Sequence, residues 1–271
     1  TNYLWTGSDG GVFKTANNGS YWSPLYYSMN ITQYYRFSQS ETNPTLILAG
    51  AQDNGTHLKN GTLWDFVLGG DGMDNAIDPD NNAIMYASSQ NGYFRKSING
   101  GSSFNQMSNL TPNGSGNWTT PIVLDPSNSN NVYIGYTRLW KSPNKGSSWS
   151  ATSNQTVGNG NIDHIAIAPS DGQVIYVSID QNLYRSDNGG TTWNQVSWTL
   201  PGSASISDIA VSSKDPNHVW VTRSGYSQNH KVFESFDGGA TWINIIGSLV
   251  NLPVNCIVYE DGSLDGVYIG T

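Results

Sequence analysis

The stretch Ser235-Phe236-Asp237-Gly238-Gly239-Ala240-Thr241-Trp242 is the clearest copy of a unit that recurs along the chain. Counted from its first residue, Ser or Thr, the unit has Asp or Asn two residues later, Gly four later and an aromatic residue seven later. Four further copies keep this spacing: Thr15/Asn17/Gly19/Trp22, Ser97/Asn99/Gly101/Phe104, Ser142/Asn144/Gly146/Trp149 and Ser186/Asn188/Gly190/Trp193. A degenerate copy keeps a shorter turn at Lys59-Asn60-Gly61, followed by Trp64. The aromatic residues recur roughly every 40 to 50 residues, which is typical of propeller blades.

Each copy has the chemistry of a tight turn between two strands. The Asn or Asp side chain can accept hydrogen bonds from backbone N–H groups two residues ahead. Glycine adopts the positive φ that a β-branched residue avoids. The hydroxyl can brace the same loop, and the aromatic residue begins the next strand and covers the turn. We therefore predict a structural role for the polar and aromatic members of the five copies: Asn17, Trp22, Asn99, Phe104, Asn144, Trp149, Asn188, Trp193, Asp237 and Trp242.

The repeated unit resembles the Asp-box (BNR) motif, and the resemblance covers nearly the whole chain. It is similar to the Asp-box propellers of sialidases, sortilin-type receptors, xyloglucan-degrading hydrolases and photosystem assembly factors. The resemblance implies an all-β fold: a six- or seven-bladed β-propeller of four-stranded antiparallel blades, formed by residues 1–271 as one domain with incomplete blades at both termini. Because one fold hosts many functions, it predicts the fold far better than the function.

Alternating apolar and polar runs predict the strands, and no helix is needed. The first blade has strands at 3–8, 11–15 and 20–26. The second and third blades have four each, at 32–38, 46–51, 56–58, 63–68, 75–77, 84–88, 92–96 and 103–107. Three more blades follow at 116–154, 161–200 and 204–248. Turns after the first strand carry Asp78-Pro79, Asp125-Pro126, Ala168-Pro169 and Asp215-Pro216, which we interpret as structural because proline fixes φ and ends a strand.

The two ends of the sequence offer the same strand of a blade. Val267–Thr271 resembles Leu4–Ser8, and Asn255–Tyr259 supplies an inner strand that can close the ring onto the first blade. The ring then has six blades with a spare strand, or seven with residues beyond Thr271. We favour the hypothesis that the sequence is a piece of a larger secreted protein, whose further domains are among its partners.

Composition excludes several classes of partner. The formal net charge is −8 and the pI is near 4.7, which argues against nucleic acid and anionic membranes because both need a basic face. No apolar run approaches the roughly 20 residues of a membrane span. The single cysteine, Cys256, lies in an apolar run, so we predict a buried, inert thiol. The abundance of Asn, Ser and Thr favours an extracellular or cell-surface protein.

Propeller geometry sorts the loops between two faces. The repeated turns and the Asp-Pro turns lie on one face, while blade-to-blade crossings and second-to-third-strand loops lie on the other, around the channel mouth. We predict that this second face binds the ligand. Its candidate residues are Asp9, Asp53, Asp71, Asp74, Trp118, Arg138, Asp163, His164, Asp180, Arg223, Tyr226 and His230.

A polar, acidic mouth with aromatic residues suits a sugar: carboxylates bond hydroxyls, aromatic rings stack on ring faces and arginines hold acidic groups. It would also suit Ca²⁺, which takes oxygen ligands; no other cofactor is expected. Structural alternatives remain open. Asp9 lies in a good hairpin loop, Gly69–Asn75 can be a strained crossing between blades, and His164 alternates with apolar residues as a structural histidine does.

Three enzymatic hypotheses are weaker. The arginine-bearing motif of sialidases is absent. A xyloglucanase-like hydrolase needs two carboxylates across a cleft, roughly 6–9 Å apart for inversion, and Asp53 with Asp71 is the candidate catalytic pair. Metal-dependent hydrolysis at Asp163 and His164 lacks further histidines at ligand spacing. We therefore predict an extracellular binding module for carbohydrate or a protein segment. The alternatives are a glycoside hydrolase domain and an architectural spacer.

Overall fold

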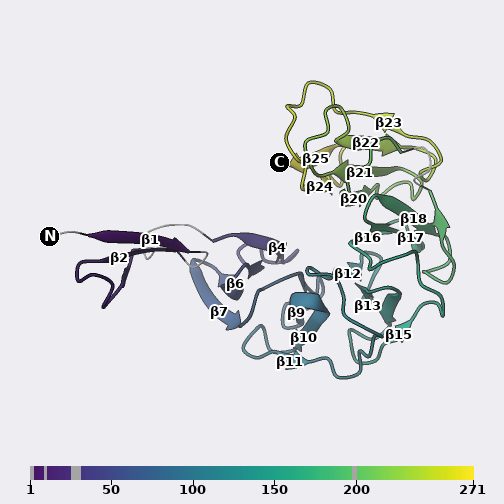
Figure 1. Ribbon diagram of the computed structural model, residues 1–271. Helices are drawn as coiled ribbons and strands as arrows, with labels where there is room; N and C mark the ends of the chain where they lie inside the picture. The colour runs from purple at the N-terminus through teal and green to yellow at the C-terminus, as the bar shows by residue number, and fades with distance from the viewer. Residues whose placement is uncertain (1–2, 9–10, 26–31, 197–199) are drawn as a thin grey trace. The chain divides into compact units, whose positions relative to one another are not determined.

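The computed structural model describes residues 3–8, 11–25, 32–196 and 200–271. The described residues are all-β: they form 25 strands in seven antiparallel sheets. A three-residue 3-10 turn, η2 (Gln90–Gly92), is an exception to the expectation of no helix. The chain divides into two compact units, Thr1–Gln106 and Met107–Thr271. Figure 1 shows the strands of both units.

The first unit contains three sheets, in which strands adjacent in sequence pair with each other. The first has the order β1 (Leu4–Ser8), β2 (Gly11–Thr15) and β3 (Ser23–Pro24). The second contains β4 (Tyr34–Gln39), β5 (Ile47–Ala51), β6 (Gly55–Asn60) and β7 (Leu63–Leu68). The third contains β8 (Asn75–Ile77), β9 (Met85–Ser89), β10 (Tyr93–Ser97) and β11 (Asn105–Gln106).

The second unit contains four sheets with the same meander order. They are β12 (Ile122–Asp125), β13 (Asn128–Gly135), β14 (Leu139–Ser142) and β15 (Ser150–Ala151); β16 (His164–Ala168), β17 (Asp171–Ile179), β18 (Asn182–Ser186) and β19 (Asn194–Gln195); β20 (Ile206–Val211), β21 (Val219–Arg223), β22 (Val232–Ser235) and β23 (Ile243–Asn244); and β24 (Cys256–Tyr259) with β25 (Val267–Gly270). The first strands of successive sheets lie beside each other, as β16, β20 and β24 do.

The repeated turns have one geometry in all five copies. The Ser235 hydroxyl accepts hydrogen bonds from the backbone N–H groups of Asp237 (3.3 Å) and Gly239 (2.8 Å), and the Asp237 carboxylate accepts one from the N–H of Thr241 (2.8 Å). The same bonds recur in the other copies. The prediction for the Asn or Asp side chain is therefore wrong in one detail, because its oxygen reaches the N–H four residues ahead. Two successive residues with positive φ, such as Gly238 (72°) and Gly239 (94°), bring that N–H into range.

The turns also hold neighbouring sheets together. Trp242 packs against the same apolar cluster as Val196, the residue that follows β19 of the preceding sheet, and its indole N–H points to the Val196 carbonyl at 3.5 Å. Phe104 packs in the same way on the cluster around Leu58. A Cβ on Gly101 would lie 2.6 Å from a Leu58 methyl group, so this glycine permits close approach as well as positive φ. The motif is therefore both a turn and an inter-sheet contact.

Two expectations need correction, and one is confirmed. Of the strand expected at 20–26, residue 26 lies outside the described residues, and the described part contains Ser23–Pro24 because the turn that follows β2 occupies residues 17–22. Cys256 is exposed, not buried, because it begins the two-stranded sheet β24–β25. The structural role of the Asp-Pro turns is confirmed at Asp78, which is fully buried and accepts hydrogen bonds from the N–H groups of Asp80 and Asn81.

Ser235→Ala tests the turn. The variant leaves the Gly239 N–H buried without its acceptor, so we expect the free energy of unfolding to fall by about 1–2 kcal/mol. Urea denaturation measures the change. Ser227→Ala, at an exposed serine, is the control and should change stability by less than about 0.5 kcal/mol. Equal effects of the two substitutions would contradict a stabilising role for the hydroxyl.

Candidate functional site

In the first unit, the proposed catalytic pair is joined by a structural contact. Asp71 is only 9% exposed, and its two carboxylate oxygens accept hydrogen bonds from the Asp53 backbone N–H (2.7 Å) and the Gln90 side-chain amide (2.5 Å). Asp53 itself is exposed and has a positive φ of 56° in the turn between β5 and β6. The Asp71 carboxylate therefore links this turn, through hydrogen bonds, to the turn between β9 and β10.

The glycine-rich crossing around Asp71 depends on close backbone approach. A Cβ on Gly72 would lie 2.2 Å from the Gly55 carbonyl oxygen, and one on Gly50 would lie 2.1 Å from the Met73 carbonyl oxygen. Asp74 follows in the crossing, and its carboxylate accepts a hydrogen bond from the adjacent Asn75 N–H (2.9 Å). These contacts match the structural alternative for this stretch.

In the second unit, Asp163 plays a similar part. Its carboxylate oxygens accept hydrogen bonds from the Asn117 side-chain amide and from the Asp180 backbone N–H (2.6 Å). Asp180 is exposed and has a positive φ of 53°, like Asp53. Burial raises the pKa of Asp163, while the hydrogen bond from Asp180 opposes the rise. The structure thus brings Asp163 and Asp180 together around a turn.

His164 lies in a contact between first strands. Its Nδ1 is 3.8 Å from a carboxylate oxygen of Asp208 in β20, and the other oxygen of Asp208 accepts a hydrogen bond from the Ile257 N–H in β24 (3.0 Å). The three residues link successive sheets through their first strands. This position agrees with a structural histidine.

A basic pair closes the loop between β21 and β22. Arg223 is 1% exposed and Lys231 is fully buried. Both side chains donate to carbonyl oxygens of nearby loops, Arg223 to Ala204 and Lys231 to Gly225. Tyr226 is 70% exposed on the same loop, and His230 stacks on Phe233 with ring centroids 6.4 Å apart. Lys231 was not predicted; the signal for it is its alternation with the apolar Phe233.

The remaining predicted residues are more scattered. Trp118 is 51% exposed in the segment before β12. Arg138 is half-buried in the turn before β14, where its carbonyl accepts a hydrogen bond from the Tyr136 N–H (3.0 Å). Asp9 lies outside the described residues. Of the predicted residues, the structure therefore joins Asp53 with Asp71, Asp163 with Asp180, and Arg223 with its loop neighbours.

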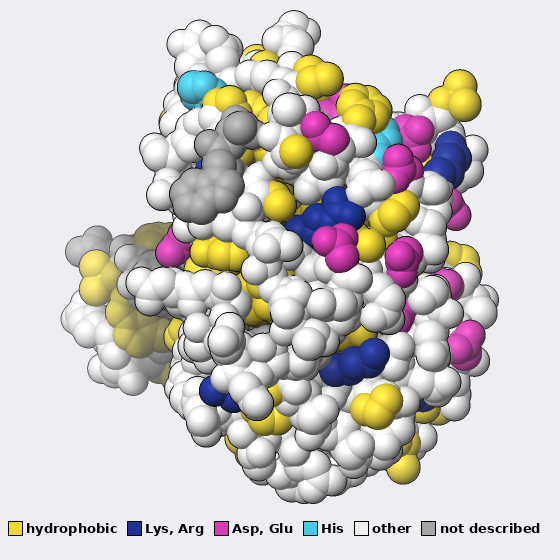
Figure 2. Space-filling model, turned by 90° about the vertical axis from the view of Figure 1, so that its right-hand side faces the viewer, with side chains coloured by type: hydrophobic (Ala, Val, Ile, Leu, Met, Phe, Trp, Pro, Cys, Tyr) yellow, Lys and Arg dark blue, Asp and Glu magenta, His cyan; other side chains and the backbone are white. Residues whose placement is uncertain are grey.

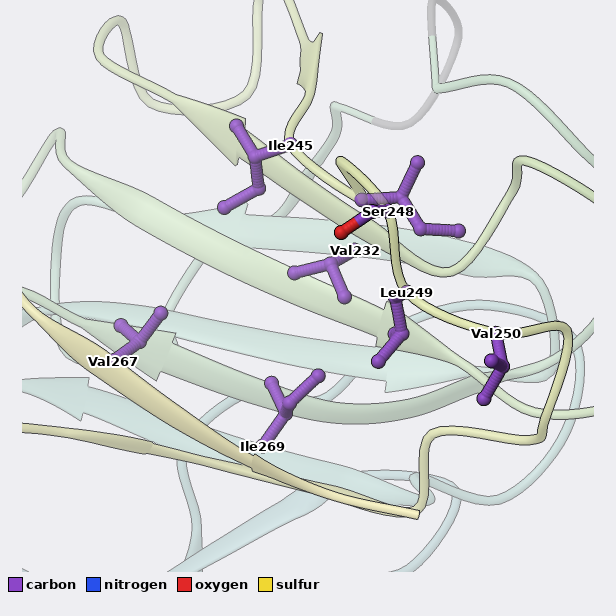
Figure 3. Close-up of a pocket in the computed structure, with 8 residues that line it drawn as sticks. Val232, Ile245, Ser248, Leu249, Val250, Val267 and Ile269 are labelled. Carbon is purple, nitrogen blue, oxygen red and sulfur yellow. The ribbon is translucent and has the colours of Figure 1, made fainter.

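An apolar groove opens beside the last sheet of the second unit (Figure 3). Its volume is about 560 Å³, and Ser248 is its polar lining residue. Its apolar lining comes from β22, from the segment after β23 and from β25: Val232, Ile245, Ile246, Leu249, Val250, Val267 and Ile269. The groove contains none of the predicted ligand-binding residues.

Charged residues make up 12% of the sequence, and both signs occur on the face that Figure 2 shows. In Figure 2, basic side chains occur in small separate groups, with acidic side chains beside some of them. Within the described ranges, no three His, Cys, Asp or Glu residues are grouped so that they could hold a metal ion. No described helix is long and apolar enough to cross a membrane.

Comparisons with known proteins support the resemblance to Asp-box propellers. A family model described as Sortilin, neurotensin receptor 3 (Sortilin-Vps10) matches residues 137–256. No curated protein matches the chain.

Solved structures with the same fold include enzymes and a peptide-binding protein. An ancestral GH74 enzyme matches with a TM-score of 0.70 and 21% identity over 99% of this chain and 42% of its own. The GH74 enzyme of Niastella koreensis matches with a TM-score of 0.61 and 19% identity, over 89% of this chain and 43% of its own. The structure of YCF48 bound to D1 peptide matches with a TM-score of 0.62 and 15% identity, over 99% of this chain and 86% of its own. The chain therefore has a propeller-type fold and spans less than half the length of the GH74 enzymes.

The pKa of Asp163 predicts a pH dependence. A carboxyl whose pKa is raised in the folded state contributes stability below its ordinary value of 3.8, and this is lost as pH rises through the folded value. Relative to Asp163→Asn, the wild-type chain should thus lose free energy of unfolding as pH rises above about 4. Urea denaturation of both proteins between about pH 3.5 and 7 measures the difference. A difference that is constant or increases with pH would contradict the assignment.

Proposed function

We propose that the chain is an extracellular ligand-binding β-propeller of six or seven blades with Asp-box turns, and that its ligand is a carbohydrate. One observation carries the proposal. Two loop carboxylates, the buried Asp71 and the half-buried Asp163, each use both oxygens in hydrogen bonds to their own chain. Carboxylates used in this way position loops. Glycoside hydrolysis instead needs an acid and a base or nucleophile directed at the substrate.

Exposed aromatic rings support sugar recognition. Trp118 and Tyr226 are 51% and 70% exposed in loops of the second unit. A ring of this kind offers a flat apolar surface to the C–H face of a sugar. Binding modules place a few such rings among polar loop residues.

A protein segment is the second candidate ligand. The observation that favours it is that a protein of the same fold, YCF48, has been solved with a peptide bound. The alternative of a glycoside hydrolase, with Asp53 and Asp71 as the catalytic pair, is favoured by the similar fold of an ancestral GH74 enzyme. Ca²⁺ bound through loop oxygens is a further proposal that metal titration can test.

Aromatic substitutions test carbohydrate binding. We expect a glycan array to identify a polysaccharide ligand, and Trp118→Ala and Tyr226→Ala each to weaken its binding at least about tenfold, because each removes a stacking surface. Matched controls are Trp5→Ala and Tyr21→Ala, which remove similarly exposed rings of the first unit, 61% and 67% exposed. Unchanged affinity in Trp118→Ala and Tyr226→Ala would contradict the proposal.

Hydrolysis is tested on the same polysaccharides. The binding proposal predicts that the chain releases no reducing ends. Release that is lost in Asp71→Asn would establish the hydrolase alternative, because the amide keeps an oxygen for the Asp53 N–H but cannot transfer a proton.

A further inference from the structure

Arg223 and Lys231 lie directly opposite each other across two paired strands. The register of β21 and β22 pairs Thr222 with Val232, and the Arg223 N–H continues it with a hydrogen bond to the Lys231 carbonyl (2.8 Å). Residues that are opposite in an antiparallel pair project to the same face, with Cβ atoms about 5 Å apart. Two basic side chains are therefore cross-strand neighbours.

The face they share is the apolar one. Side chains alternate along a strand, so Arg223 lies on the same side of β21 as Val221, and Lys231 on the same side of β22 as Phe233. Val221 and Phe233 are fully buried in the cluster between the sheets β16–β19 and β20–β23. Arg223 and Lys231 extend this face at the ends of the strands, where they are 1% and 0% exposed.

The pair lacks an acidic partner. Among the residues that the structure describes, no carboxylate forms an ion pair with either side chain, whereas Arg185 has Asp187 at 2.7 Å. A guanidinium has five N–H donors and an ammonium three. Among the described residues, their hydrogen-bond acceptors are the carbonyls of Ala204 and Gly225, and the Nε of Arg223 is buried without an acceptor.

This arrangement is costly without an anion. Like charges opposite each other on a strand pair repel, and buried charges destabilise a fold unless they are paired. Burial also lowers the pKa of the Arg223 guanidinium. A carboxylate can accept two parallel hydrogen bonds from a guanidinium and a further one from an ammonium, which removes both penalties.

We propose that Arg223 and Lys231 form a binding site for the carboxylate of a sugar acid, a uronate. The site rests on the proposed carbohydrate ligand and specifies its class. The exposed ring of Tyr226 lies over the site, 5.9 Å from the Lys231 ammonium, where it can cover a sugar ring whose carboxylate reaches the pair. Gly202 closes the opposite side, because a Cβ there would lie 3.2 Å from His230. A ligand therefore enters by displacing part of the exposed loop at 226–229.

Binding to the full chain tests the site. D-glucuronate should raise the midpoint of thermal unfolding, while D-glucose, the neutral analogue, should not. Calorimetry should show that Lys231→Met weakens D-glucuronate binding at least about tenfold, since it removes a charged hydrogen-bond donor. Arg185→Gln is the matched control, because Arg185 has its own carboxylate partner, and it should bind D-glucuronate as the wild type does.

The unliganded variant supplies a second readout. Lys231→Met removes one of two repelling buried charges, so its midpoint without ligand should be at or above the wild-type value; a purely structural lysine would lower it. If Lys231→Met does not fold, Arg223→Lys, which keeps the charge but loses the bidentate geometry, should still weaken binding. Unchanged D-glucuronate affinity in either variant overturns the site.

Further probes separate the sources of the carboxylate. If acetate raises the midpoint of thermal unfolding as much as D-glucuronate does, the site does not recognise a sugar and the proposal is overturned. If an acidic tripeptide raises the midpoint and D-glucuronate does not, the pair binds a protein ligand and the proposal is also overturned. If neutral polysaccharides bind and D-glucuronate does not, the proposed function survives and this site fails. If D-glucuronate binds through Lys231 while Trp118→Ala and Tyr226→Ala leave polysaccharide binding unchanged, the site survives and the aromatic part of the proposed function fails.

Discussion

A serine or threonine hydroxyl that accepts two backbone N–H groups is the interaction on which the architecture depends. It fixes two residues in succession at positive φ, as at Gly238 and Gly239, and so sets where the strand after the turn begins. The aromatic residue at the end of the unit then meets the preceding sheet. Because one short segment determines both the hairpin and the contact between sheets, repeating the segment repeats the stacking of sheets.

Polar contacts complete the stacking near the first strands. Ser38 donates to Asn75 between the second and third sheets (2.7 Å), and Ser207 donates to the Val254 carbonyl between the last two (2.6 Å). Asp71 and Asp163 act at the neighbouring loops, where each holds a residue with positive φ. The loops are therefore acidic in part because the fold uses carboxylates as hydrogen-bond acceptors, so acidic composition alone does not indicate chemistry.

The sequence predicts the strands better than the site, for physical reasons. Strands 63–68 and 75–77 have the expected bounds because each is limited by turn residues on both sides. Site residues depend on which turns meet, and that is set by pairing register and crossing geometry, which periodicity does not give. Lys231 shows the limit: a lysine beside a loop is usually a surface residue, and only the pairing register shows that it lies opposite Arg223, on the same side of its strand as the buried Phe233.

The apolar groove beside β25 follows from the same repeat and needs no ligand to explain it. In the preceding sheets, the equivalent position of the third strand lies in a cluster with two aromatic residues of the next sheet. Leu139 belongs to the cluster against which Tyr184 and Trp193 pack, and Leu183 belongs to the cluster that contains Phe233 and against which Trp242 packs. Val232 occupies this position in β22, but the described part of the next sheet has only β24 and β25, so no third or fourth strand supplies the aromatic pair there. The groove is thus the space that such a pair fills elsewhere in the unit, whereas the buried charges of Arg223 and Lys231 have no counterpart in the repeat that would account for them.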